Sequence, residues 1–381
     1  MRRPLSLLFL GLSLSSSWGN GHATTYRALL RGLAAAGHRI RFLERDLPWY
    51  ADNRDLCDPD FCSLHFYEGL PDLRERFSDA IMTADAVVIG SYVPEGIALT
   101  DFVLETAEGA VVFYDIDTPV TCAKLSQENS EYLAPRQVPL FDLYCSFSGG
   151  PILRVLENRF NARRAEPLYC AVDQEVYYPE ESTHPRWDLG YIGTYSVDRQ
   201  PALERLLLEP ARRLPDKRFV VAGPQYPDDI VWPPNVDRIE HLPPSQHRAF
   251  YNSLRFALNV TRADMVSAGW SPSVRLFEAA ACGTPIISDA WDGLSSFLPH
   301  PEAILIGRSS EDVTNALTHM PEARRRRIAA AAQRLVLQGH TGLARAQEFE
   351  SYLLSLRRSV GSTLQGSGLT KSGVRVALVS D

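Results

Sequence analysis

The segment Gly269–Pro285 reads GWSPSVRLFEAAACGTP, and it defines the expected architecture of the second half of the chain. Ser271 is a favourable N-cap and Pro272 suits the first helical position, so we expect a helix to begin there and to end at the following glycine. The strand-like run RFALNVT (255–261) precedes the segment, and TPIISDA (284–290) overlaps its end. A strand, a helix and a second strand in this order form the βαβ unit of a parallel sheet.

Strand-like and helical runs alternate in the same way along most of the chain. Further strands are predicted at 85–90, 110–116, 141–147, 188–194, 217–224 and 302–307, and helices at 198–213, 245–254, 309–320, 321–338 and 343–357. The polar, proline-containing stretch 172–187 lies between the two halves and is the predicted linker. Because ligands bind beyond the carboxyl ends of the strands in open parallel sheets, two facing sheets are expected to share one deep cleft.

We therefore predict an α/β protein with two facing Rossmann-like domains and a cleft between them. The expected boundaries are an N-terminal domain at 1–171, a linker at 172–187, a C-terminal domain at 188–358 and a flexible tail at 359–381. This arrangement suits a reaction of two substrates, with one substrate held by each domain.

The first 23 residues allow two interpretations. Two arginines, the apolar run LSLLFLGLSL (5–14) and several small residues resemble a signal peptide. A helical pattern at 24–38 and an alternating strand-like run at 39–46 follow, however, and with 5–14 they complete a βαβ unit. Cleavage would remove the first strand of that unit, so we favour a buried strand and a cytoplasmic location.

The composition fits an ordinary globular protein. The chain has 381 residues, of which 45% are hydrophobic and 22% charged, and its formal net charge of −7 argues against nucleic acid as the main partner.

No C-x-x-C pair is present, and no second ligand pair follows Cys57, Cys62 and His65, so we expect reduced thiols and no metal site. The basic run Arg324–Arg327 is either a solvated helix face or a weak contact to an anionic membrane surface.

The helix within Gly269–Pro285 is expected to begin at the cleft, because it comes directly after a strand. Free N–H groups and the helix dipole would make its first turn an anion site suited to phosphate, and Gly269 would let the backbone approach the ligand closely. Arg275 and Glu278 are three residues apart and share a helix face. They form either a surface ion pair or a site in which Glu278 binds ribose hydroxyls and Arg275 faces phosphates.

Three stretches of the sequence resemble those of GT-B glycosyltransferases: SVRLFEAAACGTPIISD (273–289), LGYIGTYSVDR (189–199) and AGHRIRFLERD (36–46). The stretches FSGGPILRVL (147–156) and YCAVDQEVYYP (169–179) add to the likeness. The resemblance is to the retaining, nucleotide-sugar-dependent enzymes of glycosyl transferase group 1, and among them to the CgeB-like, spore-maturation-type branch. It implies a GT-B fold, with an acceptor-binding N-terminal domain and a nucleotide-sugar-binding C-terminal domain.

The implied activity is hexosyltransferase-like: a sugar moves from a nucleotide diphosphate-sugar to an unidentified glycan, lipid, protein or small molecule. The resemblance implies no metal and no cofactor besides the donor substrate. It assigns the donor ribose to Glu278 and the diphosphate to Arg199, and the leaving phosphate can take the acceptor proton. The full set of expected donor-binding residues is Gly193, Arg199, Gly269, Ser271, Ser273, Arg275 and Glu278. Loops such as 240–245 would select the base, and Trp270 stands where the wider group has a second Glu near the transferred sugar.

The expected acceptor-side residues are Gly21, His22, Asp115 and Asp117. His22 lies in the first turn between strand and helix, where it either contacts a substrate, acts as a catalytic base, or caps the helix. Asp115-Ile-Asp117 matches the short D-x-D metal motif, but its position after a strand of the first domain favours an acceptor contact or a role in loop structure.

Other functions stay open at this stage. The turn Gly19–Thr24 partly matches the G-x-G-x-x-G of NAD-dependent oxidoreductases, and Glu44 or Asp46 follows at a distance suited to a ribose contact. Trp270 in place of a Glu would also suit a non-catalytic nucleotide-binding module of the same fold. A nucleotide-sugar epimerase, which can share this fold, is a minor alternative.

Overall fold

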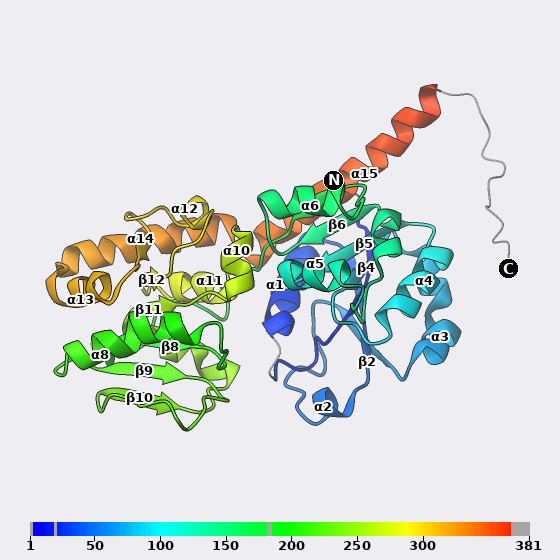
Figure 1. The fold of residues 1–381 in the computed structure, drawn as a ribbon. Coiled ribbons are helices and arrows are strands. Elements are labelled where there is room, and N and C mark those ends of the chain that lie inside the picture. Colours follow the sequence, from blue (N-terminus) through cyan, green and yellow to red (C-terminus); the bar gives the residue numbers. More distant parts are fainter. Residues whose placement is uncertain (1–2, 19–20, 181–184, 367–381) are drawn as a thin grey trace.

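The computed structural model describes residues 3–18, 21–180 and 185–366. Within these residues the chain forms two α/β domains, each with a parallel sheet between layers of helices (Figure 1). The N-terminal sheet has the strand order β3-β2-β1-β4-β5-β6-β7, and the C-terminal sheet has the order β10-β9-β8-β11-β12-β13. The fold class predicted from the alternating strands and helices is confirmed.

The N-terminal domain alternates strands and helices along the chain. Its strands are β1 (Ser6–Gly11), β2 (Arg39–Arg45), β3 (Ser63–Tyr67), β4 (Ala86–Gly90), β5 (Ala110–Asp115), β6 (Leu143–Ser146) and β7 (Ala165–Pro167). Its helices are α1 (Gly21–Ala35), α2 (Pro48–Ala51), α3 (Leu70–Thr83), α4 (Gly96–Thr106), α5 (Thr118–Ser126), the 3-10 helix η1 (Pro135–Leu140) and α6 (Pro151–Asn158).

The C-terminal domain repeats this pattern. Its strands are β8 (Trp187–Ile192), β9 (Phe219–Ala222), β10 (Val236–Ile239), β11 (Leu254–Asn259), β12 (Ile286–Ser288) and β13 (Leu305–Ile306). The helical elements that follow β8 to β11 are α7 (Gln200–Leu203), the π-helical turn η2 (Glu204–Leu208), α8 (Glu209–Arg213), the 3-10 turn η3 (Pro244–Gln246), α9 (His247–Asn252), α10 (Ala263–Ala268) and α11 (Val274–Ala281). The last helices are α12 (Leu294–Phe297), α13 (Ser310–His319), α14 (Glu322–Gly339) and α15 (Gly342–Gly366).

Strand β1 occupies the middle of the N-terminal sheet, between β2 and β4. Leu8 and Leu10 pack into the core on one face of the sheet, while Leu7 and Phe9 pack into the core on the other face. A strand covered on both faces is apolar at successive positions, which is why this run also resembles the apolar segment of a signal peptide. The buried strand predicted within 5–14 is confirmed.

Helix α15 returns from the C-terminal domain and packs along α1 of the N-terminal domain (Figure 1). Ala346, Phe349 and Leu353 on α15 are buried in the same core cluster as Phe9 of β1. The two helices lie so close together that a Cβ on Gly32 would be only 2.2 Å from the carbonyl oxygen of Gly342. Residues assigned to the C-terminal domain by sequence therefore contribute to the core of the first domain.

Several predicted boundaries differ from the structure. The helix expected at 198–213 is divided into α7, η2 and α8; Pro210 has no N–H for the α-helical ladder, and a π-helical turn precedes it. Helix α15 extends to Gly366, into the segment predicted as a tail from 359, whereas 367–381 lie outside the described residues. The start of the predicted linker is packed rather than open, since Tyr177 belongs to the core of the second domain, while 181–184 are not among the described residues.

All six cysteines lie in the described ranges and are free thiols. No cluster of three or more His, Cys, Asp or Glu side chains suited to a metal occurs in the part of the chain that the structure describes. Among the described helices, none has the length and apolar character needed to cross a bilayer.

Candidate active site in the interdomain cleft

A cavity of about 460 Å³ lies between the two domains, at the ends of the strands. From the N-terminal domain it is lined by Ser17 and Trp18 of the loop after β1, by Gly21 and Thr24 of α1, and by Asn53 and Asp55 after α2. From the C-terminal domain it is lined by Ile192–Thr194, Gly223, Pro224, the loop from His241 to Ser245, His247, Tyr251, Val274, Arg275 and Glu278. The loop after β10 that was expected to select a base thus borders the same cavity as the expected ribose ligand.

Glu278 lies on α11 with its side chain at the cavity, although the residue is only 5% exposed. The hydroxyl of Tyr251 on α9 donates a hydrogen bond of 2.9 Å to its Oε2. Burial, followed by the nearby charge of Glu278, holds the pKa of Tyr251 well above its usual value, so the phenol keeps the proton that it donates. The carboxylate is therefore oriented toward the cleft by a buried donor.

Arg275, one turn before Glu278 on α11, is held by the ends of two strands. Its Nε donates to the carbonyl of Ile192 at 2.6 Å, and its Nη1 donates to Oδ1 of Asn259 at 2.9 Å. A Cβ at Gly193 would lie 2.5 Å from the Tyr191 hydroxyl and 3.1 Å from Nη2 of Arg275, so glycine leaves room for both side chains. No ion pair between Arg275 and Glu278 occurs among the described residues, so the alternative of a surface ion pair is wrong.

A second cavity of about 210 Å³ adjoins the first and shares Gly21, Val274 and Arg275 with it. Its walls hold three guanidinium groups, those of Arg199, Arg262 and Arg275, and among the described residues no Asp or Glu lines it. The remaining lining is His22, Thr25, Ile116, Phe147, Val260, Thr261, Met265, Ser271, Pro272 and Ser273. The cavity therefore combines three positive charges with a largely apolar lining.

Arg199 is the most distinctive of these cations. Its Nη2 donates to the carbonyl of Thr194 at 2.7 Å, while its buried Nε meets no acceptor among the described residues. Burial is the largest cause that lowers the pKa of Arg199, and the positive charge of Arg275 adds to the effect. Two cations held close together with an unused donor favour an anion between the domains.

The helix that carries Glu278 begins later than predicted. Ser273, not Ser271, is the N-cap of α11, and it donates its hydroxyl to Oδ1 of Asn259 at 2.8 Å rather than capping a backbone N–H. Ser271 is instead buried between the domains, where its Oγ donates to the carbonyl of Gly269 and lies 2.7 Å from Oγ of Ser148. Both serines border the second cavity.

Gly269 and Trp270 lie where the two domains pack against each other. At Gly269, φ is +66° and a Cβ would lie 2.8 Å from the carbonyl oxygen of Asp292, so the close approach is to the chain itself and not to a ligand. The Trp270 ring fills the space beside Gly150 and Gly293, and its carbonyl accepts a hydrogen bond from the N–H of Gly149 at 2.9 Å. In the described part of the chain neither residue lines either cavity, which corrects the expectation for Gly269.

His22 lies at the first turn of α1 and lines the second cavity, and its neighbour Gly21 lines both cavities. Burial lowers the pKa of His22 to about 4, so its imidazole is neutral at pH 7. The His22 ring lies 5.5 Å from that of Tyr92, whose hydroxyl donates to Asp117 at 2.9 Å. Asp117 also pairs with Arg262 at 3.4 Å, which links the two domains beside the second cavity.

Asp115 does not reach the cleft. It is fully buried and accepts hydrogen bonds from Tyr144 at 2.6 Å, from Thr121 at 2.8 Å and from the N–H of Asp117. Burial raises the pKa of Asp115 to about 6. This residue shapes the loop that follows β5, which is the structural one of the two roles weighed for it, and an acceptor contact by Asp115 is wrong.

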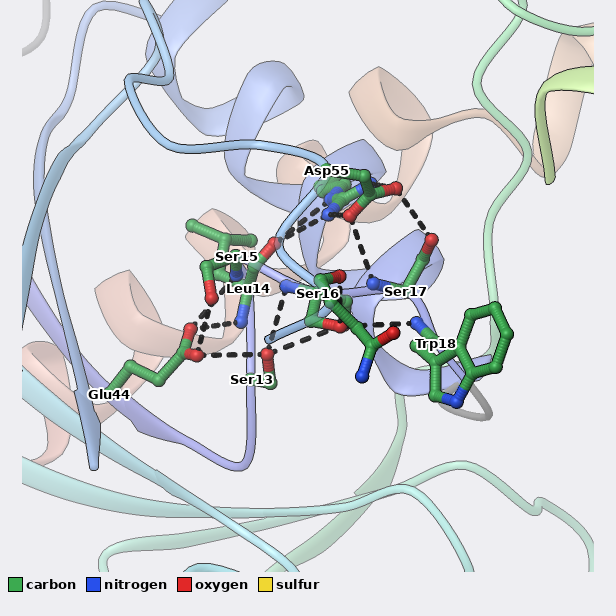
Figure 2. Close-up of polar contacts among 10 residues, drawn as sticks. Ser13, Leu14, Ser15, Ser16, Ser17, Trp18, Glu44 and Asp55 are labelled. Atoms are coloured by element: carbon green, nitrogen blue, oxygen red, sulfur yellow. Dashed lines mark hydrogen bonds and ion pairs between the residues drawn. The ribbon is translucent and has the colours of Figure 1, made fainter. Parts of the chain in front are cut away.

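The two residues expected to bind a ribose in an NAD-dependent oxidoreductase, Glu44 and Asp46, are both engaged in other contacts. Glu44 is fully buried, and its carboxylate accepts hydrogen bonds from the N–H groups of Leu14 and Ser15 and from two serine hydroxyls (Figure 2). Asp46 pairs with Arg54 at 2.6 Å. Gly19 and Asn20 of the proposed turn lie outside the described residues.

Sequence reasoning missed several residues that form the cleft. Trp18, Tyr251, Asn259 and Arg262 contribute to the cavities or position the arginines, although each lies in or next to a predicted element. A serine-rich run before a helix and a tyrosine within an amphipathic helix carry no distinctive local signal. Their roles follow from which loops the two sheets bring together.

Residues 199–351 match a protein family described as "Glycosyl transferase-like". No curated protein matches the chain in sequence. Among solved structures, sucrose-phosphate synthase from Thermosynechococcus elongatus is similar at 13% identity, covering 96% of this chain and 100% of that chain with a TM-score of 0.63. Anabaena HepE in complex with UDP has 14% identity, coverage of 92% and 100%, and a TM-score of 0.66.

An alpha-glucosyltransferase in complex with UDP-glucose and DNA containing an abasic site is also similar, at 15% identity, covering 91% of this chain and 98% of that chain with a TM-score of 0.67. At these identities the likeness shows the fold, which is the GT-B arrangement of two parallel-sheet domains. The matched family covers most of the C-terminal domain, including α11 and the arginines of the cleft.

Proposed function

We propose that this chain, whose glycosyl transferase-like domain and GT-B fold make it a glycosyltransferase, moves a sugar from a nucleoside diphosphate-sugar to an acceptor bound by the N-terminal domain. The observation that carries the proposal is the buried Glu278 carboxylate, oriented by Tyr251 at a cavity that adjoins a second one lined by three arginines. Similar solved structures are complexes with UDP, UDP-glucose or ADP, which supports a nucleoside diphosphate here.

In this proposal one donor molecule spans both cavities. The ribose lies on Glu278, with the base toward the loop from His241 to Ser245 in the larger cavity. The diphosphate lies near Gly193 and Arg275, where the cavities meet, and the sugar extends into the smaller cavity toward Arg199. The acceptor enters from the side of His22 and Asp117.

The chemistry follows from this placement. The bond between C1 of the sugar and the phosphate oxygen breaks, and a bond forms between C1 and the acceptor oxygen. Negative charge grows on the leaving diphosphate, and the fixed guanidinium groups of Arg199 and Arg275 stabilise it. The acceptor proton passes to the leaving phosphate, because His22, with a pKa of about 4, is a weak base at neutral pH and serves instead to position the acceptor hydroxyl. We propose that transfer retains the anomeric configuration and requires no metal, as in the CgeB-like enzymes that the sequence resembles.

The proposal is tested by incubating the protein with a panel of nucleotide sugars and measuring the released nucleoside diphosphate. Glu278→Ala should lower activity by at least about 100-fold, because it removes a charged hydrogen-bond acceptor from a buried ribose contact. Glu311→Ala, at an exposed position of α13 in the same domain, is the matched control and should leave activity unchanged. Full activity of a folded Glu278→Ala protein would remove the residue assignment on which the proposal depends.

A second candidate is a non-catalytic nucleotide-binding module. Trp270, which stands where related enzymes place a second Glu, is fully engaged in the joint between the domains and offers no carboxylate to a donor sugar. Binding of nucleoside diphosphates without hydrolysis or transfer of any donor in the panel would favour this candidate. Stabilisation by NAD but by no nucleoside diphosphate, measured as a thermal shift, would favour an oxidoreductase.

We propose that the basic run on α14 gives the chain a weak attachment to an anionic membrane that carries a lipid-linked acceptor. Within the basic run on α14, Arg325 and Arg326 both pair with Glu322, whereas Arg324 and Arg327 are exposed. Binding to anionic vesicles that weakens in salt and in the Arg324→Gln/Arg327→Gln double variant would support it.

A further inference from the structure

Trp18 places a partly exposed aromatic ring in the larger cavity. The residue ends the described part of the loop after β1, and it is 41% exposed. Its indole ring lies with its centroid 4.7 Å from that of the His241 imidazole, at an angle of 42°. Because Trp18 belongs to the N-terminal domain and His241 follows β10 of the C-terminal domain, this contact crosses the cleft beside the position proposed for the base.

The loop that carries Trp18 is anchored by hydrogen bonds to the Glu44 side chain. The Glu44 carboxylate accepts hydrogen bonds from the backbone N–H groups of Leu14 and Ser15, at 2.6 and 2.9 Å, and from the Ser13 and Ser15 hydroxyls (Figure 2). A single buried acid therefore fixes three successive residues of the loop. A buried carboxylate is stable only when its oxygens are satisfied in this way, so the loop and Glu44 hold each other in place.

A second carboxylate holds the end of the same loop. Asp55 accepts from the N–H of Ser17 at 3.0 Å and from the Ser17 hydroxyl at 2.6 Å (Figure 2). Arg27 of α1 pairs with Asp55 at 2.6 Å. The side chain of Trp18 extends from this fixed backbone, packs against His241 and keeps 41% of its surface exposed. A rigid loop with an exposed ring loses little conformational freedom when a planar ligand stacks on it.

We propose that the Trp18 indole is the stacking surface for the base of the donor nucleotide, so that one donor molecule is held by both domains. The inference rests on the proposed function, since it extends the ribose contact of Glu278 to the base. The cavity lined by Trp18 and His241 also holds Glu278 and Tyr251, and a nucleoside that contacts Glu278 through its ribose directs its base toward the His241 loop. Stacking on an indole tolerates every base, so Trp18 supplies affinity and leaves the choice of base to that loop.

The inference is tested by calorimetric titration of the full-length protein with UDP, ADP and GDP. For the diphosphate that binds best, Trp18→Ala should weaken binding by about tenfold or more, and Trp18→Phe should weaken it by less than about threefold, because a smaller ring still stacks. Trp49→Ala is the matched control, since Trp49 on α2 of the same domain is 63% exposed and does not line the cavity. Affinity for inorganic pyrophosphate, which has no base, should be the same in wild type and Trp18→Ala.

Each result has one meaning. Equal nucleotide affinities of wild type and folded Trp18→Ala, or an equal loss of pyrophosphate affinity in that variant, overturn the role of Trp18 while leaving the proposed function intact. A loss in Trp18→Ala together with unchanged binding in Glu278→Ala supports the stacking role and removes the ribose assignment. Absence of nucleotide binding to the wild type overturns both.

Discussion

The Tyr251 hydroxyl donates to Oε2 of Glu278 across 2.9 Å, joining α9 and α11 inside the cleft. Tyr251→Phe removes only this donor and keeps the buried ring. We expect kcat/KM for the nucleotide sugar to fall about three- to tenfold, the usual effect of one lost hydrogen bond. Steady-state kinetics measure it, and Tyr178→Phe, at an exposed tyrosine of the same domain, is the control. Identical kinetics of Tyr251→Phe and wild type would contradict the orienting role.

Arg199 lines the second cavity, its buried Nε meets no acceptor among the described residues, and its charge adds to that of Arg275. Arg199→Gln should lower kcat by about 100-fold or more, because the charge on the leaving phosphate then loses a fixed cation. Arg205→Gln changes an exposed arginine a few residues further along the same helical segment and should leave kcat unaltered. Single-turnover rates separate this effect from product release, and an unchanged rate in Arg199→Gln would rule out its role in leaving-group stabilisation.

The burial of His340 leads us to expect that part of the free energy of unfolding is lost in acid. Its ring stacks on Phe277 of α11 at 4.3 Å, and burial lowers its pKa to about 3. Above pH 6.5 the imidazole is neutral in both the folded and the unfolded chain, so its contribution is fully present. As the pH falls below 6.5 the unfolded chain takes up the proton first, and stability is lost by about 1.4 kcal/mol per pH unit until the folded-state pKa is reached.

His340→Phe should therefore flatten the decline in the free energy of unfolding between pH 7 and pH 5, while keeping an aromatic ring against Phe277. Urea titrations at several pH values measure this slope. His319→Phe, at an exposed position of α13, should retain the wild-type slope. The assignment fails if both variants follow the wild-type curve.

The crossing of α1 and α15 predicts that Gly32 tolerates no side chain. A Cβ at this position would lie 2.2 Å from the carbonyl oxygen of Gly342, and the obstacle is backbone that cannot rotate away. We expect Gly32→Ala to lower the free energy of unfolding of the first domain by about 1–3 kcal/mol or more. Gly339→Ala on α14, where a Cβ would meet nothing within 4 Å, should be neutral or slightly stabilising in the same denaturation experiment. An equally stable Gly32→Ala protein would refute the close packing of these helices.

Much of the fold could be predicted because periodicity is a local property of the chain. The apolar run that forms β1, the helix that carries Glu278 and the strands on either side of it all show their pattern within a few residues. Edge elements were harder to recognise. β7 and β10 are short, and only part of each is buried, so neither presents a long apolar or alternating run.

The sequence alone determined the alternation of strands and helices, the burial of the strand β1 and the grouping of Arg275 and Glu278 on one helix. Only the tertiary structure decided that Gly269 and Trp270 form the joint between domains, that Asp115 and Glu44 are buried under loops, and that α15 packs on the first domain. It also brought Trp18 beside His241 across the cleft. The physical reason is that such contacts join residues far apart in the chain, and whether a carboxylate meets a ligand or a backbone N–H depends on which loops the packed sheets bring together.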